Sequence, residues 1–170
     1  MGQELQRHDI RLATIDDLEA IRRIRNYYVI NSTITYEEIA WTSEDACGWF
    51  DGHGADKPVI VAEVEGAVVG YGAFGPFRTQ SGYRYTVEHS IYIEPDHHRR
   101  GIGTTLLTEL ICRAREAGYR VMVGVIDSEQ EASIALHGKF GFVNAGRLNR
   151  VGFKHGKSLD AVFVQLTLSD

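Results

Sequence analysis

A short basic loop that contains two glycines lies between a strand pattern and a helix pattern, and it constrains this chain more than any other segment. The loop is His98-Arg99-Arg100-Gly101-Ile102-Gly103, and Thr104 follows it. Residues 83–93 before the loop alternate in the strand manner, and apolar residues recur at helical spacing over 103–117 after it. Glycine allows close backbone approach, and a helix N-terminus offers unpaired N–H groups and a positive dipole end. We therefore expect this segment to bind an anion such as a pyrophosphate.

Two standard nucleotide-binding loops do not match this segment. A P-loop needs Gly-Lys-Ser/Thr, whereas this chain has Gly103-Thr104-Thr105 with no lysine. A dinucleotide-binding loop needs a third glycine three residues after Gly103, where Leu106 stands. On the residues alone, a pyrophosphate of another kind and a tight turn with a solvated basic rim both remain open.

The remaining pattern predicts an α/β fold in which helices cover one mixed sheet. Antiparallel pairing in the first half and a β-α-β crossover in the second half imply that mixture. Capping-box patterns at Thr14/Asp17, Thr42/Asp45 and Ser128/Glu131 are expected to open three of the helices. We find no repeat or linker and expect a single domain over 1–170. We expect strands over 9–14, 59–65, 67–74, 83–93, 121–126, 142–147 and 159–168, and helices over 15–30, 103–117 and 129–140, with a shorter one opened by Thr42.

Composition and charge narrow the classes of partner. A hydrophobic share of 44% with 24% charged residues is a globular balance, and a net charge of −5 argues against a nucleic-acid-binding face. No apolar run approaches the roughly 18 residues that span a membrane, and the start of the chain has no apolar signal core. Cys47 and Cys112 stand alone, so we expect reduced thiols and a cytoplasmic location. The spacing of the histidines predicts no metal site.

The loop and several other segments resemble one known family. The order of elements and the glycine loop are similar to the GNAT family of N-acetyltransferases, in which this loop binds the pyrophosphate of acetyl-coenzyme A. The resemblance is closest to the phosphinothricin and methionine sulfoximine acetyltransferase group and covers roughly residues 10–168. The segments that carry it are Asn31-Ser32-Thr33, Thr86-Val87-Glu88-His89-Ser90-Ile91-Tyr92, Ala132-Ser133-Ile134-Ala135-Leu136-His137 with Gly141-Phe142, and Gly152-Phe153-Lys154-His155-Gly156-Lys157.

Departures from the family pattern occur at three positions. His98 stands where the loop motif usually has Gln or Arg, Gln130 where the group often has Asn, and Gly82 where Ala is expected. The first two bear on the details of coenzyme contact, and the third leaves the substrate preference open. The resemblance also implies a homodimer that uses the segment around 152–166.

Two residues are candidates for acid–base chemistry. An α-amino group is mostly protonated at neutral pH, so a base must accept a proton before the amine attacks the thioester. Glu88 is our candidate because the alternation places it on the face of a strand that also carries Ser90 and Tyr92; a carboxylate that only faces solvent is the alternative. The resemblance implies an acid four residues before Gly141, where many relatives have Tyr and this chain has His137. A histidine that only packs the helix is the alternative there.

Further residues are expected around the coenzyme and the substrate. The resemblance implies that backbone N–H groups at Ile91, Tyr92 and Ile93 polarise the thioester carbonyl, and that Gln130 and Ser133 touch the coenzyme arm. A substrate with a carboxylate and a polar head needs cationic and hydroxyl partners, for which we expect Arg78, Tyr83, Arg84 and Tyr92. Solvated surface arginines are the alternative.

The expected function is acetyl-coenzyme A-dependent acetylation of the α-amino group of a small amino acid or analogue, with no metal. Phosphinothricin, methionine sulfoximine and methionine sulfone are the expected substrates. Another amine (a protein N-terminus, lysine, an aminoglycoside or a polyamine) is the first alternative. A non-catalytic module that binds coenzyme A is the second.

Overall fold

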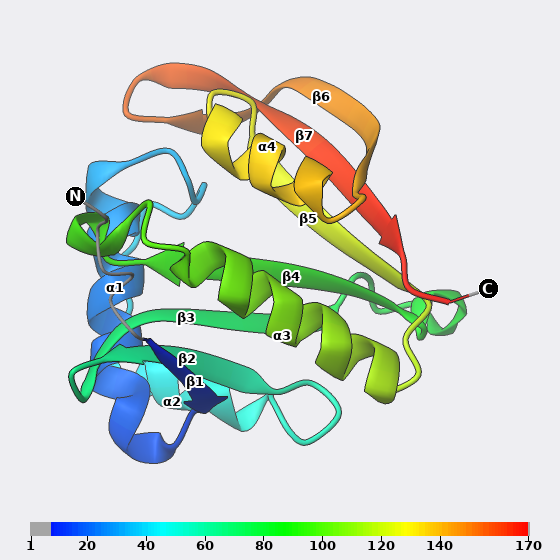
Figure 1. Ribbon diagram of the computed structural model, residues 1–170. Helices are drawn as coiled ribbons and strands as arrows, with labels where there is room; N and C mark the ends of the chain where they lie inside the picture. Colours follow the sequence, from blue (N-terminus) through cyan, green and yellow to red (C-terminus); the bar gives the residue numbers. More distant parts are fainter. Residues whose placement is uncertain (1–7, 170) are drawn as a thin grey trace, which may run out of the picture.

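The computed structural model describes residues 8–169 as a seven-stranded mixed sheet with four α-helices (Figure 1). The α/β fold expected from the sequence is thereby confirmed. The strands are β1 (Asp9–Leu12), β2 (Val59–Val64), β3 (Ala67–Pro76), β4 (Thr86–Ile93), β5 (Val121–Asp127), β6 (Val143–Lys154) and β7 (Lys157–Thr167). The helices are α1 (Leu18–Asn31), α2 (Ser43–Asp51), α3 (Ile102–Glu116) and α4 (Glu131–Lys139), and short 3-10 turns lie at Ile15–Asp17, Ser81–Tyr83 and Pro95–His97.

The sheet has the order β1-β2-β3-β4-β5-β7-β6, and all neighbours are antiparallel except β4 and β5. Among the described residues, these two parallel strands pair only at Thr86–Val121, Val87–Met122 and Glu88–Val123. Beyond Glu88 they separate, and Figure 1 shows them diverging toward the end of the sheet at which α3 begins. The sheet is therefore split along the C-terminal half of β4.

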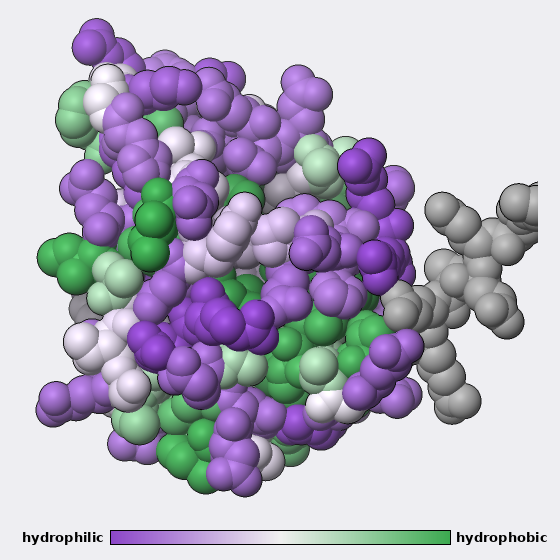
Figure 2. Space-filling model, turned by 90° about the vertical axis from the view of Figure 1, so that its left-hand side faces the viewer, coloured by the Kyte–Doolittle hydropathy of each residue, from purple (hydrophilic) through white to green (hydrophobic). Residues whose placement is uncertain are grey.

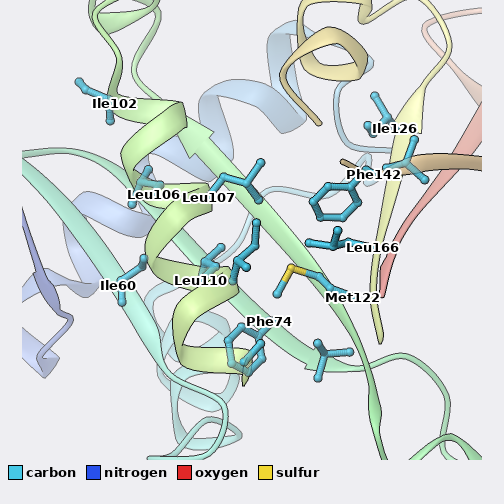
Figure 3. Packing of buried hydrophobic residues seen from close by; sticks show 14 of the residues in the cluster. Ile60, Phe74, Ile102, Leu106, Leu107, Leu110, Met122, Ile126, Phe142 and Leu166 are labelled. Carbon is cyan, nitrogen blue, oxygen red and sulfur yellow. The ribbon is translucent and has the colours of Figure 1, made fainter. Parts of the chain in front are cut away.

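Two hydrophobic clusters hold the helices on opposite faces of the sheet. The larger one joins the sheet to α3, whose Leu106, Leu107 and Leu110 have no exposed surface (Figure 3). The smaller one joins β2, β3 and β4 to α1, whose Ile21 and Ile24 are buried. These α1 and α3 positions are the apolar stripes that helical spacing predicts. The two faces of β4 therefore look into different layers.

Helix starts follow the predicted capping boxes in two of three cases. The Asp17 carboxylate accepts a hydrogen bond from the backbone N–H of Thr14 at 2.7 Å, and the Asp45 carboxylate accepts one from that of Thr42 at 2.8 Å. The predicted Ser128/Glu131 box is wrong, because Gln130 is the N-cap of α4. The carboxylate of Asp127 instead accepts a hydrogen bond from the N–H of Glu129, and this turn delays the helix.

Strand boundaries differ most from the prediction at β4 and β6. Strand β4 begins at Thr86 rather than at 83, because residues 81–83 form a 3-10 turn closed by the backbone N–H of Arg84 on the carbonyl of Ser81. Strand β6 continues to Lys154 rather than ending at 147, and register shifts interrupt its pairing with β7. Bulges of this kind break the alternation from which a strand is predicted.

Other sequence expectations can be compared directly with the structure. Cys47 and Cys112 form no disulfide, as expected, and the structure shows both to be exposed. No helix in residues 8–169 is long and apolar enough to cross a membrane. Within the same residues, no cluster of three or more His, Cys, Asp or Glu side chains has an arrangement that could hold a metal ion.

Candidate functional site

The split between β4 and β5 leaves backbone groups of β4 without a neighbouring strand. The N–H of Glu94 donates to the carbonyl of Val69 at 2.8 Å, so residue 94 directs its backbone toward β3. The N–H and C=O groups of successive strand residues point to alternate sides of the strand. Those of Tyr92 therefore also point toward β3, and those of Ile91 and Ile93 point toward the split. The carbonyl of Ile93 accepts hydrogen bonds from the side chains of Tyr28 and His98. The N–H groups of Ile91 and Ile93 are thus directed into the opening.

The N-terminus of α3 lies at the wide end of this split and has the features of an anion site. Gly101 is the N-cap with φ +84°, a conformation that favours glycine, and no side chain of the described residues caps the helix. The carbonyl of Gly101 accepts the N–H of Thr105, so the first-turn N–H groups of Ile102, Gly103 and Thr104 point out of the helix end. Figure 2 shows the side of the molecule that lies at the left of Figure 1, where hydrophilic residues surround smaller hydrophobic areas.

Three residues of the loop have roles that the sequence did not show. A Cβ at Gly103 would lie 3.3 Å from Ile93 Cδ1 and 3.4 Å from Leu136 Cδ2, so glycine there permits close packing of α3. Arg99 has φ +60°, which turns the chain into the helix. His98 Nε2 lies 2.7 Å from the Tyr28 hydroxyl and 3.0 Å from the carbonyl oxygen of Ile93, so only Nδ1 of that ring can reach a ligand.

Glu88 lies at the point where the split begins. It forms the last pair with β5, opposite Val123, and pairs with Gly75 on its other side. The carboxylate is partly buried, and Arg78 Nη1 is 4.0 Å from its Oε2. Burial raises the pKa of Glu88 above the ordinary value, and the charge of Arg78 opposes that rise. The site therefore holds a carboxylate whose affinity for a proton is increased.

The four expected substrate residues do not form one cluster. Arg78 lies beside Glu88, and the ring of Phe77 contacts both the Arg78 guanidinium and the ring of Tyr83. Arg84 instead stacks on Tyr85, with its guanidinium carbon 4.6 Å from the ring centroid. Tyr92 is buried against Tyr71 on the other side of Glu88, with the two ring centroids 5.3 Å apart. The structure thus brings Arg78 and Tyr83 together and separates Arg84 and Tyr92 from them.

His137 is paired with a second histidine on the opposite face of β4 from Glu88. Its Nε2 lies 2.9 Å from Nε2 of His89, and both rings are buried. His137 Nδ1 contacts the carbonyl oxygen of Ser133 at 2.7 Å, and His89 Nδ1 contacts that of Val123 at 2.9 Å. A Cβ at Gly124 would lie 3.1 Å from the His89 ring, so the pair packs against the first β5 residue beyond the split.

The proton count of this histidine pair is unusual. The pair makes three contacts, two with carbonyl oxygens and one between the rings. A carbonyl oxygen can only accept a hydrogen bond, so three hydrogen bonds would need three N–H hydrogens. Two neutral rings carry only two. Burial lowers the pKa of His89 to about 3 and also lowers that of His137. At neutral pH the pair is therefore neutral and can gain a hydrogen bond by taking up one proton.

Gln130 and Ser133 lie at the start of α4. The carbonyl of Gln130 accepts the N–H of Ser133 at 3.0 Å, which forms the first turn of the helix. The carbonyl of Ser133 in turn holds His137. Ser133 thus influences the histidine pair through its backbone.

Comparisons with known proteins agree with this geometry. The model of the acetyltransferase (GNAT) family matches residues 18–142. The chain belongs to this family. It is similar to the L-methionine sulfoximine/L-methionine sulfone acetyltransferase of Salmonella typhimurium, with 39% identity over 95% of each chain. It is 38% identical to the phosphinothricin N-acetyltransferase of Alcaligenes faecalis, covering 99% of this chain and 88% of the relative.

Solved structures of GNAT proteins have the same fold. A phosphinothricin acetyltransferase from Sinorhizobium meliloti, solved in complex with acetyl-coenzyme A, superposes with a TM-score of 0.92 at 38% identity, covering 95% of this chain and 89% of that one. A ribosomal-protein-alanine N-acetyltransferase from Brucella melitensis has a TM-score of 0.91 at 42% identity, covering 94% and 99%. This GNAT protein is an acetyl-coenzyme A-dependent N-acetyltransferase, and acetyl-coenzyme A is its co-substrate.

The sequence of this GNAT chain did not indicate two buried contacts, one at the site and one elsewhere in the fold. His89 has the alternation of a buried strand residue, but its partner lies 48 positions away on another element. Lys154 is fully buried, and its Nζ donates to the carbonyl of Thr35 at 2.8 Å. A lysine in a strand next to a turn normally indicates a solvated side chain, so nothing in the local pattern shows this contact.

Proposed function

We propose that the protein transfers the acetyl group of acetyl-coenzyme A directly to the α-amino group of a small amino acid or analogue, with Glu88 as the base. Phosphinothricin, methionine sulfoximine and methionine sulfone are the substrates we expect. The observation that carries the proposal is the position of Glu88, a partly buried carboxylate at the start of the split, beside Arg78. The split leads from there to the uncapped N-terminus of α3.

Glu88 has the properties of a base for an amine. Its raised pKa brings its proton affinity closer to that of the amine, and a better match favours proton transfer. The incoming amine gives a proton to this carboxylate, directly or through one water. Nitrogen then attacks the acyl carbon without an acetylated enzyme group between the two substrates.

The residues around the split fit acetyl-coenzyme A. When bound, it supplies a thioester that an amine can attack. The first-turn N–H groups of α3, with Arg99 and Arg100, would hold its pyrophosphate. The N–H groups of Ile91 and Ile93 would polarise the acyl carbonyl or hold the arm, and Gln130 and Ser133 would lie along that arm at the start of α4.

His137 supplies the second proton transfer in this proposal. Because the pair is neutral at neutral pH, it must first take up a proton from solvent between the two Nε2 atoms, and His137 then releases that proton toward the leaving sulfur. The imidazole that remains is neutral, which burial favours. Because a thiolate leaves readily by itself, we expect His137 to contribute less to the rate than Glu88.

Arg78 is the group that we assign to the substrate carboxylate. Its guanidinium is half exposed and lies next to Glu88, so an amino acid with its nitrogen at Glu88 brings its carboxylate within reach. Tyr83 lies on the same side, against Phe77. Tyr92 lies on the other side of Glu88, and Arg84 has no part in this arrangement.

A panel of amines in one thiol-release assay tests the proposed substrate class. Purified protein with acetyl-coenzyme A should release thiol with methionine sulfoximine, methionine sulfone and phosphinothricin. It should release much less with lysine, spermidine or an aminoglycoside, because Arg78 repels a second cationic group. Turnover only with the cationic amines would contradict the proposal.

A variant of Glu88 tests the proposed base. Glu88→Gln should lower kcat by about 10²-fold or more, since an amide cannot accept the proton. Glu116→Gln, at the exposed end of α3, serves as the control. An unchanged kcat for Glu88→Gln would remove this residue from the role.

A protein N-terminus is the second candidate substrate. The similarity to a ribosomal-protein-alanine N-acetyltransferase favours it, because such a substrate also offers an α-amino group. A short peptide that begins with alanine belongs in the same panel. Faster acetylation of this peptide than of the three free amino acids would select the second candidate.

We also propose that 1–170 forms a single domain and that the protein is a homodimer. Strand β6 is at the edge of the sheet, and its Val143, Leu148, Val151 and Phe153 are exposed. A second copy would cover these apolar side chains around the 152–166 segment. Light scattering during size-exclusion chromatography tests this, and a monomeric mass would contradict it.

A further inference from the structure

A cavity lies on the Glu88 face of the sheet, between the strands and helices α1 and α2. Its volume is about 170 Å³, below the roughly 300–1,000 Å³ of pockets that enclose drug-sized ligands. We call it the Arg25 pocket. The residues that matter here are Arg25, Trp49, His53, Tyr71, Ser90 and Tyr92.

The Arg25 pocket begins next to the proposed base. Gly75 lines it, and Gly75 is the residue paired with Glu88 across β3 and β4. The pocket then follows the next two pairs on this face, Ala73–Ser90 and Tyr71–Tyr92. A substrate whose nitrogen is at Glu88 therefore has Arg78 on one side and this pocket on the other.

The pocket contains buried polar groups that lack a hydrogen bond of normal geometry to the protein. In the described part of the chain, the Tyr71 hydroxyl and Nε of Arg25 are both buried without such a bond, and the two side chains interact only weakly with each other. Burial raises the pKa of Tyr71 well above its usual range, so its hydroxyl remains a donor. Leaving such groups unpaired is costly. Two donors are thus available to an occupant that carries acceptor atoms.

The charge of Arg25 is already balanced. Its Nη2 lies 3.1 Å from the carboxylate of Glu37, and its guanidinium carbon lies 4.0 Å from the centroid of Trp41. The occupant therefore need not bring a full negative charge. A cationic head would face a guanidinium and find no free carboxylate among the residues that line the pocket.

We propose that the Arg25 pocket receives the side-chain head of the acyl acceptor and selects heads that carry acceptor oxygens. A sulfone, sulfoximine or phosphinate group fits this description, and a thioether or hydrocarbon does not. This inference rests on the proposed acetyl transfer to a small amino acid, and it assigns the specificity of that reaction to Arg25 and Tyr71.

The matched substrates L-methionine sulfone and L-methionine test the proposal, because they differ only in the two oxygens of the head. The protein should prefer the sulfone by about tenfold or more in kcat/KM. Tyr71→Phe should reduce that preference severalfold by raising KM for the sulfone only, and Arg25→Met should reduce it similarly. Tyr85→Phe is the control, since Tyr85 lies on the exposed Arg84 and Arg120 guanidinium groups outside the pocket.

The stability of Tyr71→Phe separates recognition from structural damage. Because the hydroxyl forms no hydrogen bond of normal geometry with the protein, its removal should leave Tm unchanged or raise it. A fall in Tm together with equal losses for both substrates would mean that the hydroxyl serves the fold, and it would overturn the proposal.

Tryptophan fluorescence reports on the pocket independently of turnover. The chain has two tryptophans; Trp49 lines the pocket and Trp41 lies under Arg25. Titration with methionine sulfone in the presence of coenzyme A should change the emission, and Tyr71→Phe should weaken that response. If no amine is acetylated, the proposed function fails, while this titration still tests the pocket. Acetylation with an unchanged sulfone preference in both variants would overturn the pocket inference alone.

Discussion

The buried His89–His137 pair should make the protein lose stability in mild acid. Burial lowers the pKa of His89 to about 3 in the folded protein, whereas an unfolded histidine titrates near 6.5. Between these values the unfolded chain binds a proton that the folded protein does not. The contribution of His89 to the free energy of unfolding is therefore fully present above about pH 6.5 and is lost as the pH falls toward 3.

The magnitude follows from these two pKa values. Below pH 6.5, the proton that only the unfolded chain binds lowers the free energy of unfolding by about 1.4 kcal/mol per pH unit. His89 alone therefore lowers this free energy by about 2.5 kcal/mol between pH 7 and pH 4.5. Urea denaturation of the wild type and of His89→Gln at both pH values measures it. The wild type should lose about 2.5 kcal/mol more than the variant, although the variant is less stable at pH 7.

A control and a refuting result make this test specific. His155→Asn removes an exposed histidine from a turn with φ +51°, a conformation that asparagine tolerates, and should keep the wild-type slope. Equal slopes for the wild type and His89→Gln would refute the reasoning. They would mean that the folded pair already holds a proton between its rings at pH 7.

Two further predictions concern Arg78 and Gly152. Arg78→Ala removes the charge that opposes the raised pKa of Glu88, so the acid limb of the kcat profile should move to higher pH; a profile that stays in place would contradict this pairing. Gly152→Ala places a Cβ 2.6 Å from the Tyr36 ring and should destabilise the protein by about 1–3 kcal/mol. Thermal unfolding measures this, and Gly138→Ala, with nothing within 4 Å of its Cβ, should be neutral or stabilising.

The parts of the fold that local chemistry determines could be predicted from the sequence. The spacing of Leu106, Leu107 and Leu110 places α3 correctly, because a stripe at helical spacing has few other uses. The alternation through Glu88 and His89 assigns their side chains to opposite faces of one strand. Gly101 at the helix start follows from the conformation that a sharp strand-to-helix turn requires.

Features that depend on contacts between distant elements could not be predicted. The alternation of side chains predicts that β4 begins at Tyr83. The strand begins at Thr86 instead, because a 3-10 turn over Ser81–Tyr83 is closed by a backbone hydrogen bond from Arg84. Side-chain periodicity does not indicate such a bond. Arg25 has the pattern of a polar spacer on α1, and only the packing of α1 against Trp41 and Tyr92 shows it to be part of a pocket. Such roles arise from tertiary structure.

The proposed base Glu88 and His89, which is the partner of the proposed acid His137, are neighbours in sequence, and the sheet keeps them apart. Glu88 and His89 project to opposite faces of β4 because successive side chains of a strand alternate. If they shared a face, the carboxylate would stabilise a charged imidazole and lose its own raised pKa. In the proposed mechanism, the face with Arg78 would receive the amine and its proton, and the other face holds the histidine pair that would return a proton to the leaving sulfur. The split between β4 and β5 lies between these faces, which is where an acyl group must lie to contact both.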